Sequence, residues 1–303
     1  MTAAKEQTSA SGAALVLAAA ALWATFGLFT KQLYSFGYTA IEVASVRSWL
    51  GWGLVSILLL IRRRSLRLSL RELGFFALYG IVGFAFFVFL YFGLLELTSV
   101  AVAAALLYTA PAFVLLISAA LGREKLTAGR VSILLVVLLG TLLVTGASQM
   151  LLTGGAAISA MVLAVGIAAG FMYAIYTLFS KRAMEHHDAL FSLFYMFGFA
   201  SLAFTPFAPP WSSLHHIDRS WIYLAGIAIV PTLLAYGCFM TGLKRMDAGT
   251  AAMLASAEPA IAGLLAFLIL GETLSIDRII GMVLIVGAAM VLARAERVEP
   301  LPG

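Results

Sequence analysis

The chain has 303 residues, of which 63% are hydrophobic and only 11% are charged. A soluble globular domain is about 45–50% apolar and about 25% charged, so these charges are too few to cover the surface of such a body in water. The composition argues against a soluble enzyme and against a disordered chain. It indicates a polytopic membrane protein.

Long stretches without any Asp, Glu, Lys or Arg predict where the chain crosses the membrane. The longest, between Arg130 and Lys181, has room for two crossings separated by a turn signal at Thr153. A helix needs roughly 20 apolar residues to cross a ~30 Å hydrocarbon core, and these runs lack the alternation of a membrane barrel. The first run is interpreted as a retained span and not a cleaved signal, because many more follow it. The sequence therefore predicts an all-α membrane protein with ten transmembrane helices, at 13–33, 40–61, 73–94, 99–121, 129–147, 156–180, 188–208, 220–242, 249–270 and 277–293.

Lys and Arg are distributed unevenly between the two sides of this arrangement. One side carries nearly all of them, including the cluster Arg62–Arg64, whereas the other side has only Lys31, Arg219 and Arg278. Because Lys and Arg concentrate in cytoplasmic loops, this predicts a bacterial inner-membrane protein with both termini in the cytoplasm. The basic pI then reflects topology and headgroup contacts, so the lipid bilayer is an expected partner and nucleic acid is not.

The two halves of the chain align with each other at an offset of 148–150 residues. The segment Trp23–Lys31 aligns with Tyr173–Lys181, and Tyr108–Pro111 aligns with Ser256–Pro259. Each half, 1–150 and 151–303, contains an odd number of predicted spans, so the second half must enter the bilayer from the opposite face. Inverted repeats of this kind are typical of secondary transporters, whose substrate site lies near the bilayer midplane between the repeats. Duplication without transport is the alternative.

Several residues give this repeat a family resemblance: Pro111 and Pro259 at matching depth, the pair Glu258-Pro259, the helix-ending Gly271-Glu272, and Arg47 in the second span. On these residues, and over essentially its whole length, the chain resembles the drug/metabolite transporter superfamily, EamA type. Within it, the chain is most similar to YddG-type exporters of aromatic amino acids. The first half departs from the pattern, because Ala110 stands where the glutamate precedes the proline. The resemblance implies helices 1–4 and 6–9 in a basket around a central cavity, with helices 5 and 10 bracing it from outside.

Pro111 and Pro259 lie near the centres of the fourth and ninth predicted spans. A mid-helix proline removes an amide donor and disrupts the hydrogen bond to the residue four back, at about 3 kcal/mol, so the carbonyls of Leu107 and Ala255 need other partners. In a membrane such backbone is tolerated only against protein or a water-filled cavity. We expect both prolines to line the substrate path, with a packing kink as the alternative. Pro231 has no counterpart in the first half and is assigned a structural or gating role.

Glu258 is the one acid well inside a predicted span. A charge there costs roughly 2.5–3.5 kcal/mol on insertion scales, so the carboxyl is expected to be protonated, paired or exposed to a wet cavity. Three roles are open: binding the ammonium group of a substrate, carrying a proton, or pairing with Arg47 as a structural anchor. Helix geometry predicts an axial separation of about 7 Å between Glu258 and Arg47, within the combined reach of their side chains.

Aromatic side chains are abundant, with 21 Phe, 10 Tyr and 5 Trp, and most are expected to face lipid or neighbouring helices. Tyrosines at membrane depth need partners for their hydroxyls and can stack on flat or aromatic substrates. The predicted cavity residues are therefore Trp23, Tyr79, Tyr108, Tyr173, Tyr176 and Tyr236, together with Pro111, Ser256, Glu258 and Pro259. Gly166 and Gly170 fit a close-packing motif, which we expect to act inside the fold and not in dimerisation.

These features together predict a secondary transporter of small molecules that exports metabolites, or facilitates their movement, by alternating access. Amino acids, especially aromatic ones, are the expected cargo, and the helix pairs 3–4 and 8–9 are expected to open and close around the cavity. The alternatives are export of other metabolites or cationic drugs, a channel, a non-transporting sensor, or an intramembrane enzyme. The sequence has no nucleophile–base motif, metal-ligand cluster or nucleotide-binding motif, so no enzyme activity, cofactor or metal is expected. Direction, proton coupling and oligomeric state stay open.

Overall fold

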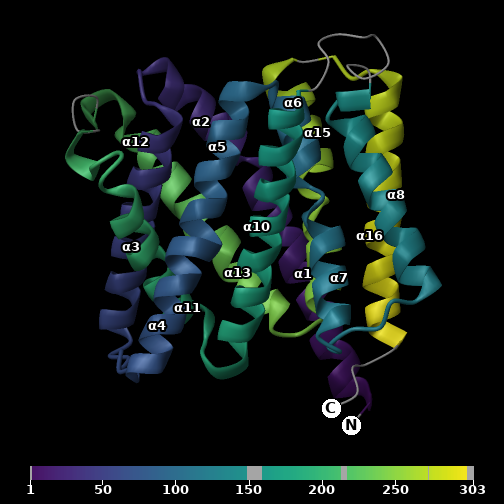
Figure 1. Cartoon of the computed structure of the whole chain (residues 1–303), viewed down its shortest axis with the longest axis horizontal. Helices are drawn as coiled ribbons and strands as arrows, with labels where there is room; N and C mark the ends of the chain where they lie inside the picture. The colour runs from purple at the N-terminus through teal and green to yellow at the C-terminus, as the bar shows by residue number, and fades with distance from the viewer. Residues whose placement is uncertain (1, 149–158, 213–216, 272, 299–303) are drawn as a thin grey trace.

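The computed structural model describes residues 2–148, 159–212, 217–271 and 273–298. Within these ranges the regular structure is helical and no strand occurs (Figure 1). In chain order the elements are α1 (Thr2–Ala24), α2 (Phe26–Ser35), α3 (Ala40–Ile61), α4 (Leu70–Leu78), η1 (Tyr79–Phe86), α5 (Phe87–Leu97), α6 (Val100–Leu107), α7 (Ala110–Ala120), α8 (Ala128–Val144), α10 (Ala160–His186), α11 (Ala189–Phe204), α12 (Ile217–Ile227), η3 (Ala228–Leu234), α13 (Ala235–Leu243), α14 (Ala248–Ala255), α15 (Glu258–Leu270) and α16 (Ile276–Val298). The prediction of an all-helical chain is confirmed.

Eight helical stretches in the described part of the chain are long and apolar enough to cross a membrane. They are Ser11–Ser35, Ala40–Ile61, Leu70–Leu97, Val100–Ala120, Ala160–His186, Ile217–Leu243, Ala248–Ile269 and Ile276–Arg294. Two further apolar helices, α8 and α11, are shorter than the roughly 20 residues of a full crossing. Each predicted span coincides with one of these stretches or shorter helices, but ten membrane crossings in inverted order stay a prediction.

Three of the expected spans are interrupted by short breaks in the helix. The first breaks at Thr25, the fourth at Tyr108 and Thr109, and the ninth at Ser256 and Ala257.

Pro111 and Pro259 are therefore each the second residue of a new helix, α7 and α15. This corrects the expectation that they kink continuous helices. The first turn of a helix accommodates proline, because its missing N–H has no intrahelical partner to lose there.

Two π-helical segments interrupt the third and eighth spans, η1 and η3. They begin 149 residues apart, and the breaks before Pro111 and Pro259 lie 148 residues apart, so the irregular backbone follows the offset of the sequence repeat. Pro231 lies inside η3. It has no proline counterpart in the sequence, but η1 has the same irregular winding without one. In η1, Gly80 allows a close approach to α11, because a Cβ there would lie 2.6 Å from the Cβ of Phe199.

The helices α8 and α16 pack against each other at one edge of the molecule (Figure 1). Their contact depends on two glycines: a Cβ on Gly281 would lie 2.6 Å from the carbonyl oxygen of Gly140, and a Cβ on Gly140 would lie 3.0 Å from that of Gly281. Small residues allow this close approach of helix backbones in membrane proteins. These helices correspond to the fifth and tenth predicted spans, for which the resemblance implied an outer position.

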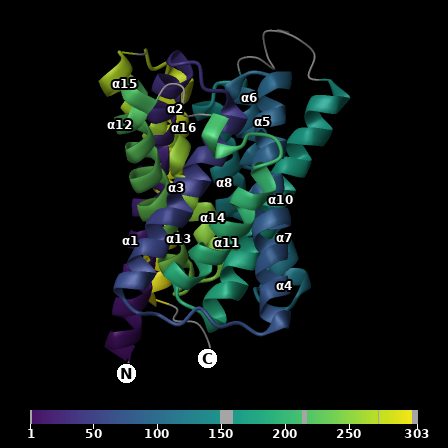
Figure 2. The ribbon, with the colours of Figure 1, turned by 90° about the vertical axis from the view of Figure 1, so that its left-hand side faces the viewer.

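The helix α1 packs against α13, α14, α15 and α16. The helix α3 packs on α11, and α10 packs on α5, α6 and α7. Both chain termini lie at one end of the bundle, called here the terminus end (Figure 1). The helices α2, α6 and α15 lie at the other end, called here the far end (Figure 2).

Candidate functional site

A cavity of about 690 Å³ lies between the two halves of the chain. Its wall includes Trp23, Arg47 and Tyr108 from the first half, and Tyr173, Tyr236, Glu258 and Pro259 from the second. Wall residues on α2 and α6 are exposed, with Tyr34 at 42% and Val100 at 69%, whereas Trp23, Arg47 and Tyr108 are only 6–7% exposed. The cavity therefore opens toward the far end and ends among buried side chains.

Glu258 is the first residue of α15 and belongs to the cavity wall. The N-terminus of a helix has free amide donors and the positive end of the helix dipole, which stabilise a carboxylate there. Tyr108, which follows α6 at the matching break of the first half, lies beside this carboxylate with its hydroxyl within interaction range. The two helix breaks therefore meet at the cavity and bring together Tyr108, Glu258 and Pro259.

Hydroxyl groups satisfy backbone carbonyls at both breaks. Thr109 donates to the carbonyl of Leu106 at 2.7 Å, and Ser256 donates to the carbonyl of Ala252 at 3.1 Å. Ser256 is fully buried and Pro111 is buried too, and neither belongs to the wall of the cavity. In this structure these two predicted cavity residues lie behind the wall and support the breaks.

Arg47, on α3, is a second charged group deep in the cavity. Its guanidinium lies beside Tyr236, within electrostatic range of the hydroxyl, and over the rings of Phe26 and Phe84, 5.0 and 5.8 Å from their centroids. Among the ion pairs of the described residues, none joins Arg47 to Glu258, so the expected structural pair is not formed. The axial estimate ignored the direction of the side chains: Arg47 contacts α13, whereas Glu258 contacts the end of α6.

Three of the predicted aromatic residues form one wall of the cavity. The rings of Trp23 and Tyr236 meet edge to face with centroids 5.2 Å apart, and Tyr173 stacks on Phe87 at 5.0 Å. These rings offer flat apolar surface beside the polar groups of Arg47 and Glu258. The arrangement suits a ligand with an apolar body and a charged end.

Tyr79 and Tyr176 do not reach the cavity and are fully buried behind this wall. The Tyr79 hydroxyl shares a 2.7 Å hydrogen bond with Ser180. Tyr176 stacks on both Tyr79 and Tyr173, with centroids 6.0 and 5.8 Å apart. The two tyrosines thus form a second layer of rings that holds Tyr173 in place.

The two glycines of α10 act inside the fold, against the break between α6 and α7. A Cβ on Gly170 would lie 2.3 Å from the Thr109 hydroxyl oxygen and 3.0 Å from the carbonyl oxygen of Leu106. A Cβ on Gly166 would lie 2.4 Å from Cδ1 of Leu106. Only glycine allows α10 to approach this irregular backbone so closely, which positions Tyr108 beside the cavity.

Some wall residues escaped the sequence analysis: Phe26, Lys31, Phe87, Tyr91 and Arg278. Phe87 and Tyr91 belong to a span with aromatic residues on all sides, so no periodic pattern distinguishes them. Lys31 did carry a signal, because it aligns with Lys181 in the repeat.

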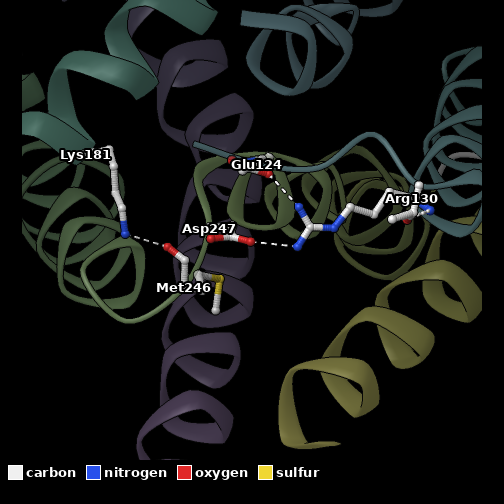
Figure 3. A network of polar contacts seen from close by, with 7 residues as sticks. Glu124, Arg130, Lys181, Met246 and Asp247 are labelled. Atoms are coloured by element: carbon white, nitrogen blue, oxygen red, sulfur yellow. Dashed lines mark hydrogen bonds and ion pairs between the residues drawn. The ribbon is translucent and has the colours of Figure 1, made fainter. Parts of the chain in front are cut away.

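A polar network joins the two halves at the terminus end (Figure 3). The Arg130 guanidinium binds Glu124 at 3.1 Å and Asp247 at 2.6 Å. Glu124 also accepts a hydrogen bond of 2.8 Å from the backbone N–H of Gly249, in the first turn of α14. Its side chain is only 3% exposed, and this burial raises the pKa of its carboxyl, while the Gly249 amide and Arg130 act in the opposite direction.

Lys181, on α10, makes a second polar contact at the same end, with the end of α13 (Figure 3). Its ammonium donates to the carbonyl oxygens of Leu243 at 2.9 Å and Met246 at 2.6 Å, where α13 ends. Carbonyls at a helix C-terminus lack intrahelical donors and carry the negative end of the dipole, so a lysine stabilises them. Its repeat counterpart Lys31 is exposed and lines the open cavity instead.

Comparison with known proteins agrees with this architecture. The model of the EamA-like transporter family matches the chain twice, at residues 10–146 and 159–294. An uncharacterized transporter of Archaeoglobus fulgidus is 29% identical over 93% of this chain and 96% of its own length. The threonine/homoserine exporter RhtA of Escherichia coli is 33% identical over 42% of this chain and 43% of its own. A protein of known crystal structure superposes with a TM-score of 0.76 at 25% identity, over 94% of this chain and 98% of that one.

The double match covers both halves on either side of the cavity. The apolar helices described above are of the kind that a multi-pass membrane protein requires. The chain belongs to the EamA-like transporter family of the drug/metabolite transporter superfamily, and it is a multi-pass membrane transporter.

Proposed function

We propose that the protein exports amino acids, aromatic ones above all, or facilitates their movement across the bacterial inner membrane, by alternating access. The observation that carries this proposal is the position of Glu258, an acid on the wall of a cavity that lies between the two halves. A carboxylate at membrane depth is costly unless it is paired or hydrated. The ammonium group of an amino acid is a partner that such a carboxylate binds well.

The cavity suits amino acids in its size and in its surface. Small-molecule sites have volumes of about 300–1,000 Å³, and this cavity, at about 690 Å³, falls within that range. Trp23, Tyr173 and Tyr236 offer rings on which an aromatic side chain can stack. The name of the relative RhtA, a threonine/homoserine exporter, supports amino acids as the broader substrate class.

The two ends of the molecule support alternating access. The distribution of Lys and Arg favours a cytoplasmic terminus end, so the cavity would face outward while the Arg130 network closes the inner side. Transport then requires the far end to close and the terminus end to open. The moving parts in this proposal are the span pairs 3–4 and 8–9, here α4 to α7 and α12 to α15, because each pair contains a π-helical segment and a helix break.

Replacing Glu258 by glutamine is expected to lower amino-acid transport by at least about tenfold, because the amide keeps the shape of the side chain but loses its charge-assisted bond to the ammonium. Counterflow of labelled phenylalanine and threonine in proteoliposomes measures this loss. Glu96→Gln is the matched control, because Glu96 is an exposed acid at the end of α5. Wild-type counterflow in the Glu258 variant would remove this residue from the substrate site. Absence of flux in the unmodified protein would contradict amino-acid transport itself.

Alternating access also makes a specific expectation for the closed form of the far end. At the repeat offset of 149 residues, Leu94 and Leu97 of α5 correspond to the two residues whose carbonyls bind Lys181. In an inverted repeat, one half adopts in the second state the contacts that the other half makes in the first. When the far end closes, Lys31 is therefore expected to bind the carbonyls of Leu94 and Leu97.

The variant Lys31→Met is expected to slow amino-acid exchange by at least about tenfold, because it loses the charge-assisted hydrogen bonds of the closed form, each of which contributes roughly 1.5–3 kcal/mol. Its affinity for amino acids at equilibrium is expected to stay near that of the unmodified protein, since the open form needs no such bond. Lys244→Met, an exposed lysine beside the end of α13, is the control. Exchange at the unmodified rate in Lys31→Met would contradict this closing step.

A further inference from the structure

Two buried donor groups on residues of the cavity wall have no hydrogen-bond partner among the residues that the structure describes: Nε of Arg47 and Nε1 of Trp23. These residues are 6% and 7% exposed, and both belong to the cavity wall. A buried donor without a partner costs about 1–3 kcal/mol, and more when it is charged. A ligand acceptor beside Arg47 and Trp23 would relieve this cost.

Both donors lie beside one residue, Tyr236. The guanidinium of Arg47 lies within electrostatic range of its hydroxyl, and the ring of Trp23 meets its ring edge to face at 5.2 Å. Contacts with the faces of Phe26 and Phe84 hold the guanidinium without occupying its Nε–H. Trp23, Arg47 and Tyr236 thus form a donor-rich group, called here the Arg47 pole.

The same cavity has a second pole of opposite character, formed by Glu258 and Tyr108. No ion pair joins the two poles within the described part of the chain, so each charge is left to act on a ligand. Tyr236 lies within electrostatic range of both Arg47 and Glu258, so the two poles are close to each other in the same cavity. A cavity with separate positive and negative poles matches a molecule that carries both charges.

We infer that the Arg47 pole binds the carboxylate of the substrate while Glu258 binds its ammonium, so that the site selects zwitterionic amino acids over amines. This inference rests on the proposed function and assigns the half of the substrate that Glu258 does not hold. The planar guanidinium matches the geometry of a carboxylate, and the indole N–H of Trp23 adds a further donor. A cationic drug or amine would leave the Arg47 pole buried and unpaired, which is the strongest way for a site to reject an analogue.

Binding of matched ligands to the purified full chain in lipid nanodiscs tests the inference. Phenylalanine and threonine are compared with phenethylamine and 1-aminopropan-2-ol, which lack only the carboxylate. The unmodified protein is expected to bind the amino acids about tenfold or more tightly than the amines. In Arg47→Gln the amino acids are expected to lose about tenfold in affinity, whereas the amines keep theirs within about twofold.

Trp23→Phe is the second variant, which keeps the test decisive if Arg47→Gln fails to fold. It removes the indole N–H but keeps an aromatic ring, and it is expected to lower the preference for amino acids about threefold. Trp52→Phe is the matched control, because Trp52 lines a separate apolar groove between α3 and α11. Equal losses for amino acids and amines, or an unchanged preference, overturn the inference and leave transport intact. If the unmodified protein binds neither class of ligand, the proposed function fails instead.

Discussion

Replacing Arg130 by glutamine is expected to open the terminus end of the protein. The Arg130 guanidinium holds two carboxylates from different halves of the chain, Glu124 and Asp247. Removing one partner of a buried ion pair costs about 3–5 kcal/mol, because it leaves an uncompensated charge. Separation of the two halves relieves that cost by hydrating the carboxylates. The open form of this end is therefore expected to rise at least about tenfold in population.

The effect of Arg130→Gln is expected to grow as the pH rises. Burial raises the pKa of Glu124, and Arg130 opposes that shift, so the variant holds the proton on Glu124 more firmly. At low pH the protonated carboxyl no longer repels Asp247, and the end stays closed. As the pH rises through the elevated pKa, Glu124 becomes charged beside Asp247 and the two halves separate.

Cysteine labelling measures this opening. Ser118, on α7, is 1% exposed, so Ser118→Cys in a Cys238→Ala background gives a single buried reporter. A membrane-impermeant maleimide added at the terminus end is expected to label it faster when Arg130→Gln is present. Arg123→Gln is the matched control, because its ion pair with Glu185 is exposed at the side chains by 46% and 31%. Equal labelling rates in the two variants would mean that the Arg130 network does not hold this end closed.

The sequence predicted the helices well and their interruptions less well. The thickness of the hydrocarbon core sets the length of apolar helix that a crossing requires. The long uncharged runs of the sequence therefore locate the helical stretches. The prolines indicated irregular backbone, but not that new helices begin there, beside the hydroxyls of Thr109 and Ser256 that bind carbonyls of the preceding turn. The π-helical η1 left no sequence signal, since its close packing uses ordinary glycines such as Gly80.

The sequence indicated which charged residues belong to the candidate site, but not the directions in which their side chains extend. Glu258 and Arg47 both belong to the cavity wall, and a charge in an apolar span is a strong signal. Their pairing, one of the three roles open for Glu258, is not among the ion pairs of the described residues, because depth along a helix gives no information on which neighbour a side chain meets. Tyr173 and Tyr176 illustrate the same difficulty. They stack on each other on one face of α10, yet only Tyr173 reaches the cavity.

Gly170→Ala is expected to destabilise the protein by about 1–3 kcal/mol, although alanine forms helices better than glycine by about 1 kcal/mol. The new Cβ would lie 2.3 Å from the Thr109 hydroxyl oxygen, and 3.0 and 3.3 Å from the carbonyl oxygens of Leu106 and Leu107. The hydroxyl cannot turn away without losing its 2.7 Å bond to Leu106, and the carbonyls are backbone. The helix break must therefore move away from α10.

Thermal unfolding in detergent micelles measures the loss, with Gly53→Ala as the control. A Cβ on Gly53 would meet nothing within 4 Å, so that substitution is expected to be neutral or to stabilise α3 by up to about 1 kcal/mol. If Gly170→Ala and Gly53→Ala unfold at the same temperature, the close contact between α10 and the break does not exist.

The Gly170→Ala substitution also links the packing of α10 to the binding of the ligand. Tyr108 precedes Thr109 at the break and lies beside Glu258, so moving the break is expected to withdraw its hydroxyl from the carboxylate. Gly170→Ala protein that remains folded is therefore expected to bind phenylalanine about tenfold more weakly, the effect of one lost charge-assisted hydrogen bond. Gly53→Ala is expected to bind as the unmodified protein does. Unchanged binding in a destabilised Gly170→Ala protein would separate the stability of the break from the ammonium site, and Glu258 would then act without Tyr108.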